Sequence, residues 1–357
     1  YPLRRQRQMC IRDSSSSPHA RHVPPSMAAV DADVAVEAAL RGSALGSAAA
    51  VQCRVPVIDM SGPAAEIEAA LWAAANEVGF FTITNHGIAQ QTIDAAFRAS
   101  AQFFACTREE KEAMSPFAKE LNSGYEFYSQ VRPSTGTPDQ KESLQITARA
   151  GAMDGRWPTK PEGFESAAQD LMKDAHELAC RLLSLLQARA CPDLEPGTLA
   201  KGHTLWADDG QCTLRMLHYP PVPTVDNAAG LWRAGPHTDW CCCTLLFQRP
   251  GEVGLECAAN PRVAPAGSEK CGWAAVDPVE GGIAVNIGDM LSRWSDGRLY
   301  SNLHRVRMPV GEECERPRYS IAFFAQANKG CIIKSEQSPP ITAGDYILGR
   351  IKSNFAQ

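Results

Sequence analysis

The stretches Pro236-His237-Thr238-Asp239-Trp240 and Ser301-Asn302-Leu303-His304-Arg305-Val306 decide the fold of this chain. His237 and Asp239 are two residues apart, so in an extended strand both side chains project from one face, about 6–7 Å apart. His304 belongs to a separate, later strand. The three side chains can converge only if the two strands face each other, and a jelly roll supplies that arrangement.

Two histidines and one carboxylate form a ligand set suited to iron(II). Such sets, known from non-haem iron oxygenases, hold one face of the metal and leave other positions open. His237 and Asp239 alone are a weak signal, because this spacing arises by chance and a histidine on an apolar strand is more often a core residue. The addition of His304 and of Arg318-Tyr319-Ser320 makes the iron interpretation the preferred one.

Arg318 and Ser320 share one face of a strand by the two-residue period. Arginine can donate two parallel hydrogen bonds to a carboxylate. Arg318 also precedes the apolar run Ile321-Ala322-Phe323-Phe324, where a charge needs a partner. A surface ion pair or a buried structural bridge would supply one, but a dianionic ligand fits the cation and the hydroxyl together.

After about residue 205, short strand signals alternate with Gly and Pro, and this pattern predicts a jelly roll or barrel. The expected strands are 211–219, 240–248, 273–277, 282–287, 299–308 and 318–325. Upstream, apolar spacing predicts helices after Pro63, over 90–104 and over 165–190, and strands at 55–60, 79–84 and 141–146. The stretch 115–160 is otherwise expected to be a functional loop, a lid or pocket wall.

The chain carries a series of short motifs in a fixed order. They are Val55-Pro56-Val57-Ile58-Asp59, Gly79-Phe80-Phe81, Asn85-His86-Gly87, His237-Thr238-Asp239, Asn286-Ile287-Gly288-Asp289, Asn302-Leu303-His304-Arg305-Val306 and Arg318-Tyr319-Ser320. In this combination the chain resembles the 2-oxoglutarate- and iron(II)-dependent dioxygenase superfamily. The likeness is to the branch that contains isopenicillin N synthase and flavonol synthase, and it covers about residues 53–350.

The resemblance implies an α+β fold, with a double-stranded β-helix (jelly-roll, cupin-like) core and flanking α-helices. It implies an N-terminal, mostly helical region over 53–204 and a catalytic core over 205–350, forming one integrated unit. Iron(II) would be bound by His237, Asp239 and His304. The keto and C1 carboxylate oxygens of 2-oxoglutarate would chelate the iron, and the distal carboxylate would meet Arg318, Ser320 and Tyr219.

The expected activity is oxidation of a small organic molecule by O2, with 2-oxoglutarate converted to succinate and CO2. Hydroxylation, desaturation and ring closure all remain open. In enzymes of the isopenicillin N synthase type the same Arg-x-Ser pair grips the substrate's own carboxylate, so an iron(II) oxidase without 2-oxoglutarate is the alternative. A non-catalytic carboxylate sensor on the same fold is a third interpretation. Tyr125, Phe127 and Phe324 are candidate substrate contacts, with plain packing as the alternative.

Composition narrows the class of protein. The 357 residues are 44% hydrophobic and 21% charged, as in ordinary globular proteins. The net charge of −5 lacks the excess of basic residues that is typical of nucleic-acid-binding proteins. No apolar run in the sequence is long enough to cross a membrane. We expect a cytoplasmic monomer that binds a small molecule. The 13 cysteines include no Cys-x-x-Cys pair, which favours buried, reduced thiols.

The N-terminal 52 residues are expected to be a disordered or foreign extension. Residues 1–26 are basic and serine-rich, residues 6–14 resemble translated sequencing-adaptor sequence, and Met27 is a plausible start. An organelle transit peptide, which is also rich in Arg and Ser, is the alternative.

Overall fold

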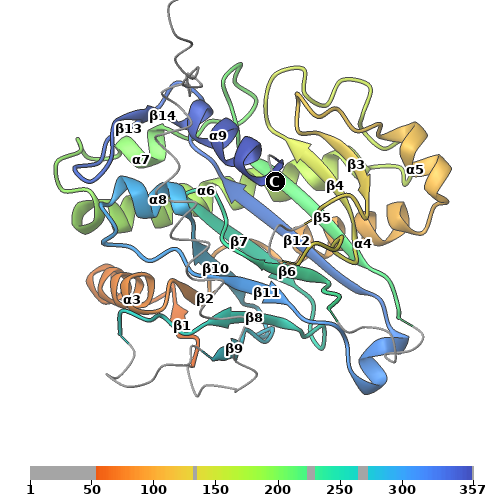
Figure 1. The fold of residues 1–357 in the computed structure, drawn as a ribbon, viewed down its shortest axis with the longest axis horizontal. Helices are drawn as coiled ribbons and strands as arrows, with labels where there is room; N and C mark the ends of the chain where they lie inside the picture. The colour runs from red at the N-terminus through yellow and green to blue at the C-terminus, as the bar shows by residue number, and fades with distance from the viewer. Residues whose placement is uncertain (1–53, 132–134, 223–229, 264–271, 356–357) are drawn as a thin grey trace, which may run out of the picture.

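The computed structural model describes residues 54–131, 135–222, 230–263 and 272–355 (Figure 1). The expected extension 1–52 and its proposed foreign segment 1–26 lie outside the described residues. Within the described residues, no helix is long and apolar enough to cross a membrane.

Two β-sheets form the centre of the molecule (Figure 1). The larger has the strand order β1-β2-β10-β7-β12-β5-β4-β3, and the smaller β6-β11-β8-β9. The larger sheet contains β1 (Val57–Asp59), β2 (Phe80–Thr84), β3 (Gly124–Phe127), β4 (Glu142–Thr147), β5 (Thr213–Tyr219), β7 (Cys243–Gln248), β10 (Ile283–Ile287) and β12 (Arg318–Ala325). The smaller contains β6 (Ala234–His237), β8 (Leu255–Ala258), β9 (Trp273–Ala275) and β11 (His304–Val306), and β13 (Ile332–Ile333) pairs with β14 (Ile341–Thr342).

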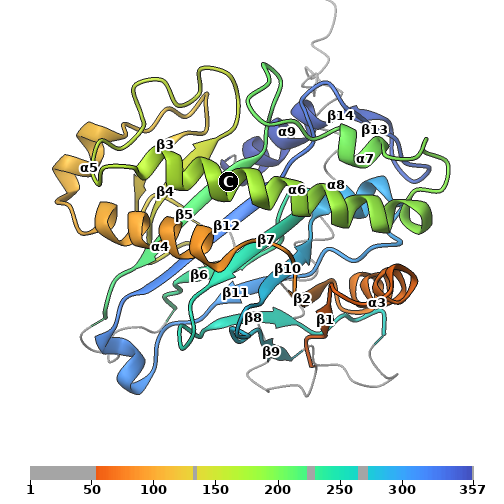
Figure 2. The same ribbon diagram turned by 180° about the vertical axis from the view of Figure 1, so that it is seen from behind.

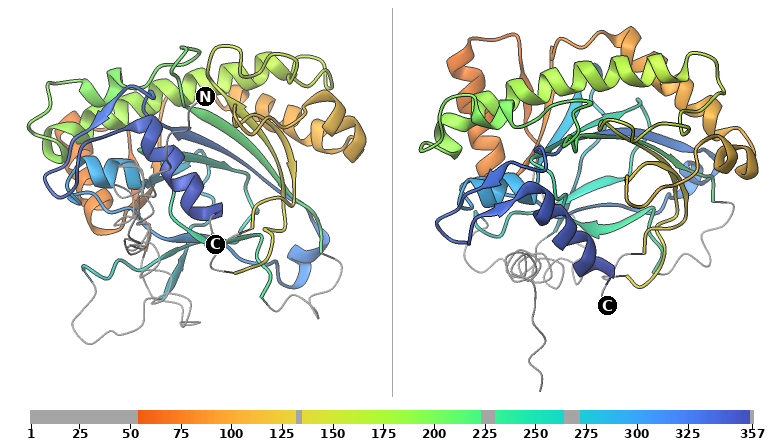
Figure 3. Two further views of the ribbon diagram at one scale, coloured as in Figure 1. Left: turned by 45° about the horizontal axis from the view of Figure 1, so that its top comes forward. Right: turned by 90° about the horizontal axis from the view of Figure 1, so that it is seen from above.

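Helices cover the outer face of the larger sheet. In Figure 2, which is seen from behind, α6 and α4 cross in front of β12 and β7, and Figure 3 shows α9 on the opposite side from α6. The helices are α3 (Ala64–Glu77), α4 (Gln90–Phe104), α5 (Arg108–Met114), α6 (Phe164–Ala190), α7 (Thr198–Lys201), α8 (Asp289–Trp294) and α9 (Ala343–Phe355), with a 3-10 turn at Gly311–Glu315.

The apolar spacing of α6 explains its place. Leu171, Ala175, Leu178 and Leu182 recur at helical spacing and are all buried, so this face packs against α4 and the larger sheet. The resulting outer core joins residues of α3, α4 and α6 to residues of β7, β10 and β12. A second cluster, which we call the inner core, lies between the two sheets; it includes Phe80, Leu217, Tyr219, Leu255, Cys257, Val306 and Ala322.

Several elements differ from the expectation. Helix α5 was not anticipated, although Thr107 and Glu110 form a reciprocal capping box at its start. Strands β6 and β8 were also missed, because Gly and Pro interrupt β6 and the hydrophobic run of β8 is short. The expected strand 299–308 shrinks to β11, and strand β3 was not foreseen within the stretch 115–160.

Candidate metal centre

The centre begins with two histidines on neighbouring strands. His237 ends β6 and His304 starts β11, and the two are direct register partners in this antiparallel pair. Their ring centroids are 4.2 Å apart. The two strands therefore lie side by side in one sheet, and this pairing places the two histidines opposite each other. Hydrogen-bonded neighbours bring opposed side chains together directly.

Asp239 joins the histidines from outside the strand. Strand β6 ends at His237, so Asp239 lies two residues beyond the strand. The Nε2 atoms of His237 and His304 each lie 3.7 Å from Asp239 Oδ1. Ligand atoms bound at about 2.0–2.2 Å from one ion can be at most about 4.4 Å apart. Both 3.7 Å separations satisfy this limit. The three ligand atoms all lie within 4.8 Å of one another, and the cluster is therefore a candidate site for a single ion.

Main-chain carbonyls orient both imidazoles. His237 Nδ1 donates to the Gly235 carbonyl at 2.8 Å, and His304 Nδ1 donates to the Asn302 carbonyl at 3.3 Å. A carbonyl can only accept, so the proton is on Nδ1 in each ring. Both Nε2 lone pairs are consequently available to a metal, which is the usual arrangement of metal-binding histidines.

Two donors fix the carboxylate of Asp239. Thr244 Oγ1 donates to Asp239 Oδ2 at 2.6 Å, and Asn286 Nδ2 donates to the same oxygen at 2.9 Å. Thr244 and Asn286 are register partners on β7 and β10. They occupy one oxygen and leave Oδ1 directed toward the histidines. Neither role was inferred from the sequence, although Asn286 belongs to a motif singled out there.

A second carboxylate holds the loop that carries Asp239. The Asp289 main-chain N–H donates to the Asp239 carbonyl at 2.7 Å. The side chain of Asp289 accepts from Thr238 at 2.9 Å and from Ser301 at 2.6 Å, and it pairs with Arg350 of α9 at 2.8 Å. The loop position therefore depends on contacts from three separate parts of the chain.

Arg318 is the first residue of strand β12 and lies beside Tyr219 of the inner core. It is 2% exposed and donates to Gln248 Oε1 at 2.8 Å, to Ser320 Oγ at 3.3 Å and to the Glu252 carbonyl at 3.4 Å. Its guanidinium carbon lies 5.0 Å from the centre of the Tyr219 ring. The structure thus brings Arg318, Ser320 and Tyr219 together.

The three candidate substrate contacts are dispersed. Phe324 packs against the inner core. Tyr125 lies in the outer core, where its hydroxyl donates to Glu142, and burial raises the pKa of Tyr125. Phe127 is 39% exposed and stacks with Tyr128. The structure brings Phe324, and neither Tyr125 nor Phe127, to the inner core.

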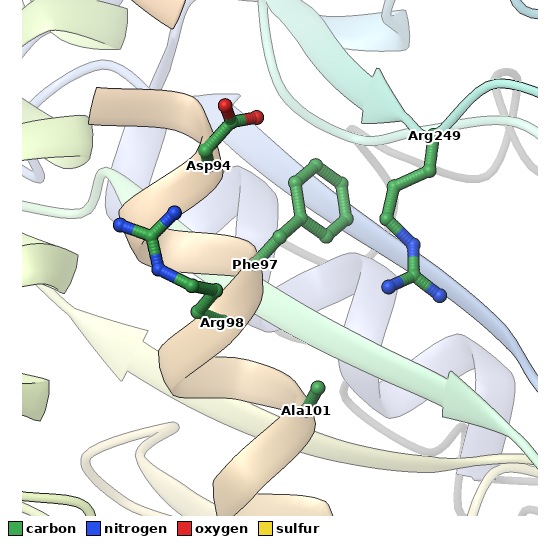
Figure 4. Close-up of a pocket in the computed structure, with 5 residues that line it drawn as sticks. All are labelled: Asp94, Phe97, Arg98, Ala101 and Arg249. Carbon is green, nitrogen blue, oxygen red and sulfur yellow. The ribbon is translucent and has the colours of Figure 1, made fainter. Parts of the chain in front are cut away.

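A surface hollow of about 250 Å³ lies elsewhere, on the outer side of the fold. Figure 4 shows its lining, which comes from helix α4 and from the end of strand β7: Asp94, Phe97, Arg98, Ala101 and Arg249. None of these residues belongs to the metal cluster or the inner core.

The described cysteines are free thiols, as expected. Burial raises the pKa of Cys241, Cys242 and Cys243 well above the ordinary value, so these thiols stay protonated and behave as small apolar side chains.

Comparisons with known proteins agree with this site. The N-terminal family model for non-haem dioxygenase in morphine synthesis matches residues 55–162, and the 2OG-Fe(II) oxygenase superfamily model matches residues 210–327. A 2-oxoglutarate-Fe(II) type oxidoreductase, hxnY of Emericella nidulans, is 33% identical over 78% of this chain and 82% of its own.

Solved structures give the same assignment. A full-length Neurospora crassa protein in complex with alpha-KG and thymine has a TM-score of 0.70 at 27% identity, covering 84% of this chain and 96% of that one. A 2OG-Fe(II) oxygenase family protein from Caulobacter crescentus has a TM-score of 0.69 at 26% identity, covering 84% and 98%.

The chain belongs to the 2OG-Fe(II) oxygenase superfamily. It has the α+β architecture of that family, with a double-stranded β-helix core, and it is an oxidoreductase that uses iron(II) and 2-oxoglutarate.

Proposed function

We propose that His237, Asp239 and His304 are the iron(II) ligands of this dioxygenase. The observation that carries the proposal is the approach of one nitrogen from each histidine to a single carboxylate oxygen. Two imidazoles and one carboxylate are the donors that open iron(II) sites use.

Arg318, Ser320 and Tyr219 would bind the distal carboxylate of 2-oxoglutarate. The partners of Arg318 among the described residues are neutral oxygens, so its charge is not neutralised by a carboxylate there. When bound, iron(II) and 2-oxoglutarate supply the oxidising chemistry, in which O2 is consumed and succinate and CO2 are released. The chain's own residues bind, orient and shield the reactants.

An anaerobic titration of the apoprotein with iron(II) and then 2-oxoglutarate tests this assignment. We expect a weak visible charge-transfer band only when both are present, because the band reports bidentate chelation. Iron binding without that band would favour the oxidase type that uses no 2-oxoglutarate. Binding of both without succinate release on any substrate would favour the non-catalytic carboxylate sensor.

His237→Ala should abolish turnover and iron binding while the protein remains folded. The variant removes one of three ligands and leaves the β6–β11 pairing in place. The measurements are iron content after anaerobic loading and the unfolding midpoint. His86→Gln is the matched control, because His86 accepts from the Ile88 N–H and is expected to be structural. Full activity of His237→Ala would overturn the site assignment.

The substrate is a small organic molecule, oxidised by hydroxylation or desaturation. This extends to the present chain what is known of its relatives, one of which binds thymine. Phe324 is the substrate contact that the structure supports best, because it borders the inner core. Screening small molecules by substrate-dependent succinate release tests the proposal. If Phe324→Ala shows the same preference among the screened substrates as the wild type, Phe324 is not a substrate contact.

We further propose that residues 53–204 and 205–350 act as one catalytic unit. The outer core contains side chains from both segments, so neither can bury its apolar face alone. The chain is proposed to act as a cytoplasmic monomer, with no nucleic-acid or membrane partner, and size-exclusion chromatography with light scattering tests the oligomeric state.

A further inference from the structure

Arg233 is a buried arginine that the sequence did not point to. Its side chain is 3% exposed, and among the described residues neither Nε nor Nη2 has a hydrogen-bond partner. Burial of an unpaired guanidinium is strongly unfavourable. Arg233 lies just before strand β6, which ends at His237.

A neighbouring, half-buried arginine, Arg305, has partners for its charge within the protein. Arg305 stacks on Trp232 and Trp273, with its guanidinium carbon 4.8 Å and 3.9 Å from the ring centres. It also donates to Glu256 at 2.6 Å. Arg305 is therefore neutralised within the protein, whereas Arg233 is not.

Arg233 and Arg318 lie against the same aromatic ring. Their guanidinium carbons are 5.9 Å and 5.0 Å from the centre of Tyr219. The nearby carboxylate of Glu313 is engaged by Arg307, at 2.7 Å and 2.9 Å. Burial, and then the charge of Arg318, lower the pKa of Arg233. Two cations thus share one buried region, and no carboxylate of the described residues is hydrogen-bonded to either.

We propose that Arg233 is a second cationic contact for the distal carboxylate of 2-oxoglutarate, acting with Arg318. A carboxylate has two oxygens and about four acceptor sites, so it can accept from both guanidinium groups. One bound anion would satisfy the unpartnered atoms of Arg233 and remove the repulsion between the two arginines. This inference rests on the proposed assignment of Arg318, Ser320 and Tyr219 to the same carboxylate.

The test compares two 2-oxo acids on iron(II)-loaded, anaerobic protein. 2-Oxoglutarate carries the distal carboxylate, and 2-oxopentanoate has a methyl group in its place. Dissociation constants come from the charge-transfer band, and the readout is the ratio of the two constants. A change at the metal alone affects both acids equally and leaves the ratio unchanged. The proteins are the wild type, Arg233→Met, Arg233→Lys, Arg318→Met and the control Arg305→Met.

We expect Arg233→Met to weaken 2-oxoglutarate binding by at least about tenfold, because a buried charged contact is lost. Binding of 2-oxopentanoate should change little, so the preference for 2-oxoglutarate should fall. Arg233→Lys should restore part of the preference for 2-oxoglutarate, and Arg305→Met should keep the wild-type ratio of the two dissociation constants. The thermal shift produced by 2-oxoglutarate should shrink in parallel.

An unchanged ratio in a folded, iron-binding Arg233→Met protein would overturn the role of Arg233. If Arg318→Met also leaves the ratio unchanged, the proposed carboxylate site itself is wrong. A loss in Arg318→Met without one in Arg233→Met would overturn only the present inference. The two failures are therefore distinguishable.

Discussion

At the residue scale, the two oxygens of the Asp239 carboxylate have different surroundings. Its Oδ2 accepts from Thr244 and Asn286, while Oδ1 faces the two histidines. Each donor stabilises the orientation that leaves one oxygen open. Such supporting contacts tune metal affinity although they never touch the ion.

Thr244→Val should weaken iron(II) binding by about 10–100-fold. Valine keeps the shape of threonine and removes the hydroxyl that donates to Asp239 at 2.6 Å. Anaerobic iron(II) titration gives the affinity. Thr213→Val is the control, since Thr213 is buried and its hydroxyl accepts from Gln326 instead. Equal iron affinity in both variants would show that the hydroxyl does not position Asp239.

His203 should make the fold sensitive to mild acid. Burial lowers the pKa of His203 from 6.5 to about 4. The unfolded chain therefore binds a proton near pH 6.5 while the folded protein does not. Stability from this group is complete above pH 6.5 and is lost as pH falls toward 4, by about 3 kcal/mol in total.

Denaturant unfolding of the wild type and of His203→Asn between pH 7.5 and 4.5 checks this expectation. The asparagine amide can still donate to the Leu199 carbonyl, which His203 Nδ1 contacts at 2.6 Å. The loss of stability between the two pH values should be smaller in the variant. Equal losses would show that other groups cause the acid sensitivity.

At the element scale, strand register assembles the site. His237 opposes His304 on β6 and β11, and Thr244 opposes Asn286 on β7 and β10. Likewise, Arg318 opposes Tyr219, and Ser320 opposes both Leu217 and Gln248. These pairs are cross-strand neighbours, and a slip of one residue would turn their side chains to the other face.

Gly288→Ala should disturb the loop that carries Asp239. Gly288 joins β10 to α8, and an added Cβ would overlap the Cys241 carbonyl. Overpacking of this kind destabilises by about 1–3 kcal/mol. Iron(II) affinity should fall together with stability, as measured by titration and by denaturant unfolding. Gly281→Ala is the control, because an added Cβ meets nothing within 4 Å there, although its positive φ adds some strain. Wild-type iron affinity in Gly288→Ala would contradict the expectation.

At the scale of the whole molecule, the C-terminal helix is connected to the loop that carries Asp239. Arg350 of α9 is 1% exposed and pairs with Asp289, whose main-chain N–H binds the Asp239 carbonyl. Helix α9 therefore contacts a loop more than one hundred residues earlier in the chain through the Arg350–Asp289 ion pair, and Arg350 also lies over the Trp240 ring of that loop.

Arg350→Met should lower the free energy of unfolding by about 3 kcal/mol, because one partner of a buried pair is removed. Iron(II) binding should also weaken. Lys352→Met on the same helix is the control, since Lys352 is exposed and surface changes alter stability little. A variant that is less stable but binds iron(II) normally would limit Arg350 to a structural role.

The sequence by itself determined the kind of ligands and the class of fold. His237, Asp239, His304 and Arg318 are recognisable because their chemistry is specific and their order is fixed. The long helix α6 and strand β12 were also predictable, since local periodicity sets which face each buries. Strand β12 even keeps its expected bounds of 318–325.

Only the tertiary structure decided how these residues meet. It placed Asp239 beyond the end of its strand, made His237 and His304 neighbours in one sheet, and brought Thr244, Asn286 and Arg350 to the support of the site. It also revealed the buried position of Arg233. These relations depend on register and long-range packing between segments, and neither leaves a local signal in the sequence.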